Sequence, residues 1–169
     1  MSLAEQTQAI AKIFISKGWT IALAESCTGG LVCAALTELP GSSDWFERGY
    51  ITYSNQAKSE CLGVPVELIE SFGAVSEPVA KAMAEGAQRN AGTNVGASIT
   101  GIAGPTGGSP DKPVGTVCFG WTIPHGTGEF VTHTKTKLFS GDRQAVRQQA
   151  TEYVLTELIA LLRITSTQS

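Results

Sequence analysis

The 169-residue chain has no apolar run long enough to span a bilayer. Its first residues, 1–5, lack the basic and apolar regions of a signal peptide, so we expect a cytoplasmic protein without a membrane partner. Runs of basic residues are also missing, and the formal net charge is −3. A nucleic-acid partner is therefore not expected, because a phosphate backbone is bound through clustered lysine and arginine.

The chain is also poor in metal ligands. It contains two histidines, both late in the sequence, and four cysteines: Cys27, Cys33, Cys61 and Cys118. No two cysteines form the Cys-x-x-Cys pair of a zinc knuckle or a thioredoxin-like site. We therefore expect no metal and no cofactor, and we expect every cysteine except Cys27 to be a small core residue.

What the chain does contain is an alternation of strands and helices. Hydrophobic residues make up 42% and charged residues 16%, and the length suits one domain, residues 1–169, with a frayed tail over 163–169. Short apolar runs with β-branched members predict strands over 19–24, 49–54, 95–100, 115–121 and 130–136. Caps and helical periodicity predict helices over 2–18, 31–36, 56–62 after an Asn55 cap, 65–72, 76–92 and from Asp142 onward. This order predicts a three-layer α/β/α sandwich with a mixed sheet of about five strands.

The stretch 24–30, with sequence Ala-Glu-Ser-Cys-Thr-Gly-Gly, lies between the first strand of the sheet and a helix. Ligands of open α/β sheets bind at the carboxyl ends of strands, so Ser26, Cys27 and Thr28 are candidate site residues. Gly29 and Gly30 would let backbone amides approach a bound group, and the helix start would offer N–H donors to an anion. The alternative is an ordinary turn in which Ser26 or Thr28 only caps the helix.

Two further loops, 41–58 and 100–113, are predicted to reach the same sheet edge. The second loop is rich in glycine and proline and longer than a connection needs, which is typical of binding loops. Lys58 follows Ser26 by 32 positions and could act as its base if burial lowers the pKa of its amine. Tyr53 could relay a proton or orient that lysine. The alternatives are a solvated helix lysine and a half-buried strand aromatic.

Four segments together make the sequence resemble a known family. They are residues 24–30, Gly41-Ser42-Ser43 with Phe46 and Gly49, Tyr53-Ser54-Asn55 with Ala57-Lys58, and 98–116. In this order they resemble the C-terminal domain of the competence-damage-inducible protein A (CinA) family, over roughly residues 10–162. Stand-alone members of that family deamidate nicotinamide mononucleotide to nicotinate mononucleotide and ammonia.

The resemblance implies a set of roles for particular residues. Ser26 would be the nucleophile, Lys58 the general base and Tyr53 a supporting proton relay. The substrate-binding candidates are Cys27, Thr28, Gly29, Gly30, Gly41, Ser42, Ser43, Asn55, Thr100, Gly101, Gly104 and Arg143. Backbone N–H groups over 27–30 or 100–101 would hold the oxyanion, and Ser42, Ser43, the glycine loop and Arg143 are the candidates for the substrate phosphate. A small-molecule substrate, no cofactor and a homodimer are also implied.

Two other functions remain open from the sequence. The same loops could form a module that binds a pyridine nucleotide without converting it. A different hydrolase could use Cys27 as its nucleophile. Ammonia release separates the first alternative from an amidohydrolase, and the activities of Ser26→Ala and Cys27→Ala separate the second.

Overall fold

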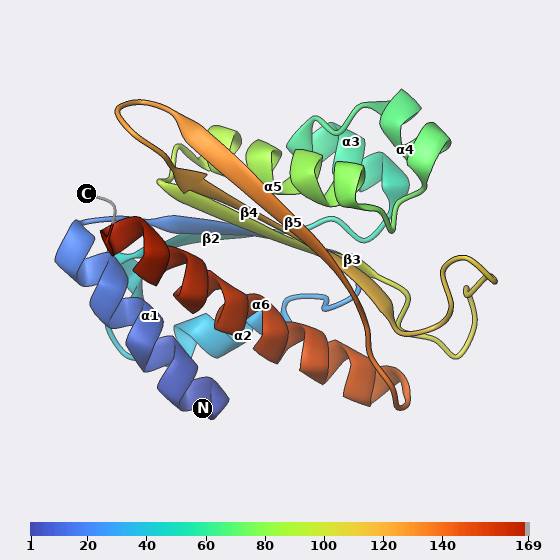
Figure 1. Cartoon of the computed structure of the whole chain (residues 1–169), viewed down its shortest axis with the longest axis horizontal. Helices are drawn as coiled ribbons and strands as arrows, with labels where there is room; N and C mark the ends of the chain where they lie inside the picture. Colours follow the sequence, from blue (N-terminus) through green and yellow to red (C-terminus); the bar gives the residue numbers. More distant parts are fainter. Residues whose placement is uncertain (168–169) are drawn as a thin grey trace.

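The computed structural model describes residues 1–167 and contains one five-stranded sheet (Figure 1). The strands are β1 (Ile21–Glu25), β2 (Phe46–Ile51), β3 (Val95–Gly101), β4 (Thr116–Pro124) and β5 (Phe130–Leu138). They lie in the order β2-β1-β3-β4-β5. The first three strands are parallel, whereas β4 and β5 are antiparallel to their neighbours. The predicted mixed sheet of five strands is confirmed.

Helices cover both faces of this sheet, which confirms the predicted three layers (Figure 1). One face carries α1 (Leu3–Lys17), α2 (Leu31–Thr37) and α6 (Arg143–Thr167), and the other carries α3 (Asn55–Leu62), α4 (Val66–Phe72) and α5 (Glu77–Ala91). A short 3-10 turn, η1 (Ser42–Asp44), precedes β2. Within residues 1–167, no helix combines the length and the apolar character needed to cross a bilayer.

The strand β1 shows why the sheet is buried on both faces. Its side chains alternate: Ile21 and Leu23 pack among α1, α2 and α6, whereas Ala22 and Ala24 pack against α3 and α5. The small residues on the second face let α5 lie close to the sheet. A Cβ added to Gly120 in β4 would lie 2.6 Å from the carbonyl oxygen of Ala80. Burial of both faces anchors the strand that carries the loop at its carboxyl end.

Several helix ends differ from the sequence prediction in detail. The capping box of Ser2 and Glu5 on α1 is confirmed, and Asp142 accepts a hydrogen bond from the Ala145 amide at the start of α6. The cap of α3 is Ser54 and not Asn55, because the Ser54 hydroxyl accepts from the Ala57 amide. The last helix, α6, continues to Thr167 although the tail was expected to fray from residue 163, and residues 168–169 lie outside the described part of the chain.

The parallel strands place three loops at one edge of the sheet. Glu25, the last residue of β1, lies in register with Ile51 of β2 and Ile99 of β3. The chain therefore leaves β1, β2 and β3 on the same side. The strand β2 begins and ends three residues before the predicted range because Phe46 already pairs with Ile21.

Candidate functional site

The Lys58 amine and the Ser26 hydroxyl meet at this edge of the sheet. Nζ of Lys58 lies 3.1 Å from Oγ of Ser26. Ser26 directly follows β1, whereas Lys58 lies one turn into α3, so the contact depends on β1 and β2 being parallel neighbours. The two residues predicted to form a nucleophile–base pair are thus brought into contact.

The Lys58 amine is enclosed by oxygen atoms and shielded from solvent. The side chain is 1% exposed, and Nζ also donates to the carbonyl oxygens of Thr52 at 3.0 Å and Tyr53 at 3.2 Å. Burial lowers the pKa of Lys58 because it penalises the charged ammonium. A neutral amine can donate two N–H groups to these carbonyls, which leaves its lone pair for the Ser26 hydroxyl.

A cavity of about 250 Å³ opens above this pair. Its lining includes Ser26, Cys27, Tyr53, Asn55, Lys58, Thr100, Gly101, Gly104 and Arg143, together with Ala74, Val75, Ile102, Ala103, Thr106 and Gly107. The lining contains two basic side chains, Lys58 and Arg143, and no carboxylate. The cavity therefore suits a neutral reacting group with an anion nearby.

The start of α2 is not available to a ligand anion, contrary to the sequence prediction. The Glu25 carboxylate, which is fully buried, accepts hydrogen bonds from the amides of Gly30, Val32 and Cys33 at 2.9–3.1 Å. A negative group at a helix N-terminus satisfies free N–H donors and the helix dipole. Neither Ser26 nor Thr28 caps the helix, because Glu25 performs that function.

The backbone N–H groups of residues 26–29 differ in whether they have a hydrogen-bond partner. The Ser26 amide donates to the Ile99 carbonyl, and the Gly29 amide donates to the Ser26 carbonyl. Among the described residues, the amides of Cys27 and Thr28 have no hydrogen-bond partner in another residue. Cys27 lines the cavity and Thr28 is fully buried outside it, so of the expected oxyanion donors over 27–30 the Cys27 amide remains.

The structure separates several other predicted site residues from the cavity. Gly41, Ser42 and Ser43 lie at the opposite edge of the sheet, where the Ile21 amide of β1 donates to the Trp45 carbonyl, so within one chain they do not line the cavity above Ser26. Thr28, Gly29 and Gly30 shape the turn without lining the cavity. The resemblance to the family named residues that shape the fold together with residues that line the cavity, and it did not separate the two groups.

Tyr53 and Arg143 form a bridge across the cavity mouth. The Arg143 guanidinium donates to the Tyr53 hydroxyl and to the Gly104 carbonyl, both at 2.8 Å. Tyr53 contacts Lys58 through its backbone carbonyl, while its side chain is 59% exposed. The Tyr53 hydroxyl is bonded to Arg143 and not to Lys58, and its role as a proton relay stays a prediction.

Cys27 lines the cavity but is a poor nucleophile. Burial raises the pKa of its thiol to about 11, so the reactive thiolate is scarce at neutral pH. Cys118 is buried and Cys33 is half-buried, but Cys61 is exposed, which corrects the expectation that it belongs to the core. Within residues 1–167, no three His, Cys, Asp or Glu side chains are grouped as metal ligands.

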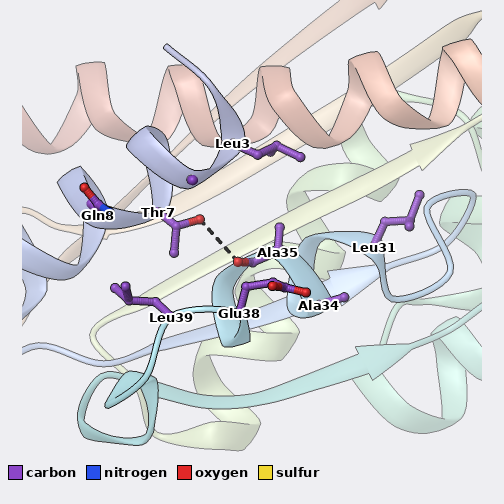
Figure 2. Close-up of a pocket in the computed structure, with 9 residues that line it drawn as sticks. Leu3, Thr7, Gln8, Leu31, Ala34, Ala35, Glu38 and Leu39 are labelled. Atoms are coloured by element: carbon purple, nitrogen blue, oxygen red, sulfur yellow. Dashed lines mark hydrogen bonds between the residues drawn. The ribbon is translucent and has the colours of Figure 1, made fainter.

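A larger groove of about 520 Å³ lies between α1 and α2, away from the Ser26–Lys58 pair (Figure 2). Figure 2 shows Leu3, Leu31 and Leu39 around it, with the Thr7 hydroxyl bonded to the Ala35 carbonyl. Its lining is mostly apolar and contains neither a nucleophile–base pair nor a cation. The smaller cavity above Ser26 is the candidate site because it holds the reactive groups.

Arg147 is a residue near the site that the sequence analysis missed. Its guanidinium donates to the carbonyl oxygens of Cys27 at 3.0 Å and Thr28 at 3.4 Å. Arg147 lies one helical turn after Arg143, so the two side chains share a face of α6. That spacing is visible in the sequence once Arg143 is considered for the site.

Comparisons with known proteins identify the family of this chain. Residues 3–162 match the CinA C-terminal domain family. The chain is 50% identical over 158 residues to a protein of Escherichia coli named nicotinamide-nucleotide amidohydrolase PncC, covering 94% of this chain and 92% of that one. A putative competence-damage inducible protein of Symbiobacterium thermophilum is 48% identical, but the match spans 36% of its length.

Solved structures show the same fold. The competence or damage-inducible protein from Enterobacter asburiae superposes with a TM-score of 0.89 at 38% identity, covering 96% of this chain and 99% of that one. The protein from Agrobacterium tumefaciens gives 0.86 at 40% identity, covering 95% and 99%. The family match, the identity to full-length relatives and the shared fold lead to one conclusion: this chain belongs to the CinA C-terminal domain family.

Proposed function

We propose that the protein is an amidohydrolase that converts nicotinamide mononucleotide and water to nicotinate mononucleotide and ammonia. The observation that carries the proposal is the 3.1 Å contact between Lys58 Nζ and Ser26 Oγ in a cavity without carboxylates. The name of the E. coli relative supports this choice of substrate. A serine hydroxyl attacks an amide only when a nearby base takes its proton, and Lys58 is placed to do so.

In the first half of the reaction, Ser26 Oγ attacks the carboxamide carbon while its proton passes to Lys58 Nζ. The carbonyl oxygen becomes an oxyanion, which we assign to the Cys27 amide, because Cys27 lines the cavity and its amide has no partner in another residue. One such donor accelerates related reactions by about 10²–10³. Lys58 then returns its proton to the leaving nitrogen, the C–N bond breaks, and ammonia departs from an ester on Ser26.

In the second half, water attacks the ester carbon while Lys58 takes a proton from that water. The ester C–O bond breaks, Ser26 recovers its proton from Lys58, and the nicotinate product is released. One amine therefore acts twice as base and twice as acid. A lowered pKa suits this double use because both forms of the amine are then accessible.

The substrate phosphate is assigned to Arg143. The cavity of about 250 Å³ is small for a whole nucleotide, and Arg143 also lines a second cavity of about 580 Å³ along α6. The guanidinium has five N–H donors, of which its bonds to Tyr53 and Gly104 use two. We place the pyridine ring above Ser26 and the phosphoribosyl group toward α6.

The wider biological role is part of the same proposal and rests on the family resemblance. We propose that the chain works as one domain in the cytoplasm, forms a homodimer and recycles pyridine nucleotides. Its partner would be a small molecule, without nucleic acid or membrane.

The direct test is an ammonia-release assay on nicotinamide, its riboside and its mononucleotide. We expect turnover of the mononucleotide, loss of turnover in Ser26→Ala, and normal turnover in Ser16→Ala, a change at an exposed serine of α1. Tight binding of the mononucleotide without ammonia release would instead show a nucleotide-binding module.

A further inference from the structure

We infer that Lys112 is a positioning residue that holds together two walls of the cavity above Ser26. The inference rests on the proposed function, because it concerns how that cavity binds the substrate. Lys112 lines neither this cavity nor the one along α6, so it is not placed to contact the nucleotide. It acts through the loop and the turn that do line the cavity.

The two walls come from segments that lie far apart in the chain. Ala74 and Val75, in the turn between α4 and α5, line one part of the cavity. Residues 102–104, 106 and 107, in the long loop between β3 and β4, line another part. The Thr100 hydroxyl donates to the Ala74 carbonyl at 2.9 Å, which ties the turn to the sheet but not to the loop. Neither wall belongs to a helix or strand, so side-chain contacts must fix one wall against the other.

Lys112 makes such a contact between the loop and the turn. Its Nζ donates to the carbonyl oxygen of Phe72 at 2.6 Å, although the two residues are 40 positions apart. Phe72 is the last residue of α4, where a carbonyl has no partner within the helix. A Cβ added to Gly73 would lie 3.1 Å from the same Nζ, so the amine also lies against the backbone just before Ala74.

The part of the loop that carries Lys112 is itself well held. The Lys112 amide donates to the Ser109 hydroxyl at 3.1 Å, and the Ser109 amide donates to the Lys112 carbonyl at 2.9 Å. Val114 packs directly on the cavity-lining part of the loop, because a Cβ added to Gly104 would collide with Cγ1 of Val114. A shift of Lys112 would therefore reach Gly104, whose carbonyl accepts from Arg143 at the cavity mouth.

Holding the two walls in place before the substrate arrives lowers the entropy cost of binding. Without the Lys112 contact, the loop would take several positions relative to the turn, and binding would have to select one of them. That cost applies equally to the bound substrate and to the transition state, because both occupy the same walls. Loss of the Lys112 amine should therefore raise KM and leave kcat nearly unchanged.

The test compares ammonia release by Lys112→Met and Lys112→Arg with wild type. In Lys112→Met, which keeps the length of the side chain but not its donor, we expect KM to rise about 5- to 50-fold with kcat within about threefold. In Lys112→Arg, KM should stay within about threefold of wild type, because the guanidinium can still donate to the Phe72 carbonyl. A nonspecific protease should also cut the loop over 105–113 faster in Lys112→Met than in wild type.

Lys12→Met is the matched control, since it changes an exposed lysine of α1 and should leave kcat and KM unchanged. If Lys112→Met lost kcat in proportion to its folded fraction while KM stayed the same, the role of Lys112 would be purely structural. If KM rose for the mononucleotide but not for its riboside, Lys112 would bind the phosphate. Either result would overturn the inference.

The outcomes also separate this inference from the proposed function. An active wild type whose Lys112→Met variant keeps its KM would overturn the inference alone. If wild type binds the mononucleotide without releasing ammonia, the proposed function fails, and a matching rise in the dissociation constant of Lys112→Met would still support the inference. A wild type that neither binds nor converts the mononucleotide would overturn both.

Discussion

Glu25 and Ser26 are neighbours in the chain, yet their side chains point to opposite sides of the same turn. The Glu25 carboxylate is bonded to three amides of α2, and the Ser26 hydroxyl is bonded to Lys58. The change of side follows from the alternating directions of consecutive side chains at the end of a strand. The acidic residue therefore supports the nucleophile by holding its turn, and it does not join the reaction.

Replacing Glu25 by Gln should lower the free energy of unfolding by about 1–3 kcal/mol. The amide keeps the shape of the side chain but loses charge-assisted bonds to the amides of α2 and places an NH₂ group where only donors face it. Urea unfolding would measure the change. Glu38→Gln, at an exposed carboxylate following the same helix, should shift stability by less than about 0.5 kcal/mol. Equal effects in both variants would contradict the role given to Glu25.

Lys58→Arg should reduce kcat by about 10²–10⁴, because a guanidinium remains protonated and cannot act as a base. In wild type, kcat should rise with pH as the buried amine of Lys58 loses its proton and then reach a plateau. Because burial lowers the pKa of Lys58, the plateau should begin below the ordinary pKa of lysine. If kcat does not change over the pH range in which the Lys58 amine loses its proton, Lys58 is not the base.

The same pKa shift should appear in stability. The folded state binds fewer protons than the unfolded state between the lowered pKa of Lys58 and its ordinary value, so the free energy of unfolding rises with pH across that window. Lys58→Met should lack this rise and should be the more stable protein on the acidic side of the window, where wild type still buries an ammonium. Unfolding curves at several pH values would measure this, and parallel pH profiles of the two proteins would refute it.

Cys27→Ala should retain kcat within about threefold, because the thiol with a pKa raised to about 11 takes no part in the chemistry. Ammonia release by Cys27→Ala and Ser26→Ala, measured side by side, gives the comparison. If activity is lost in Cys27→Ala and kept in Ser26→Ala, the nucleophile is Cys27 and not Ser26.

Tyr53→Phe should leave kcat within about threefold, because the Tyr53 contact to Lys58 is made by the backbone carbonyl. KM should change more than kcat, since the lost hydroxyl is a partner of Arg143 at the cavity mouth. Arg143→Ala should raise KM for the mononucleotide but not for the riboside, which has no phosphate. A kcat loss of about 10² or more in Tyr53→Phe would support the proton-relay role.

Most helices and strands of this protein could be predicted from local sequence patterns. The Ser2 and Glu5 capping box, the glycines that end helices and the small apolar run of β3 each predict one element through local backbone chemistry. Where prediction was wrong, a competing partner decided the outcome, within the chain segment for α3 and on a neighbouring strand for β2. Ser54 capped α3 in place of Asn55, and pairing with β1 moved β2 toward Phe46.

The sequence by itself determined the order of strands and helices, the apolar faces that bury the sheet, and the residue types available for chemistry. Only the tertiary structure decided which of those residues meet. Ser26 and Lys58 are in contact because two parallel strands end at one edge, and Arg147 reaches the same turn from a helix 120 residues later in the chain. Ser42 and Ser43 carry similar hydroxyls, but they precede the next strand and so lie at the other edge. The physical reason is that periodicity specifies which face of an element is buried, whereas contacts between distant elements depend on how those faces pack together.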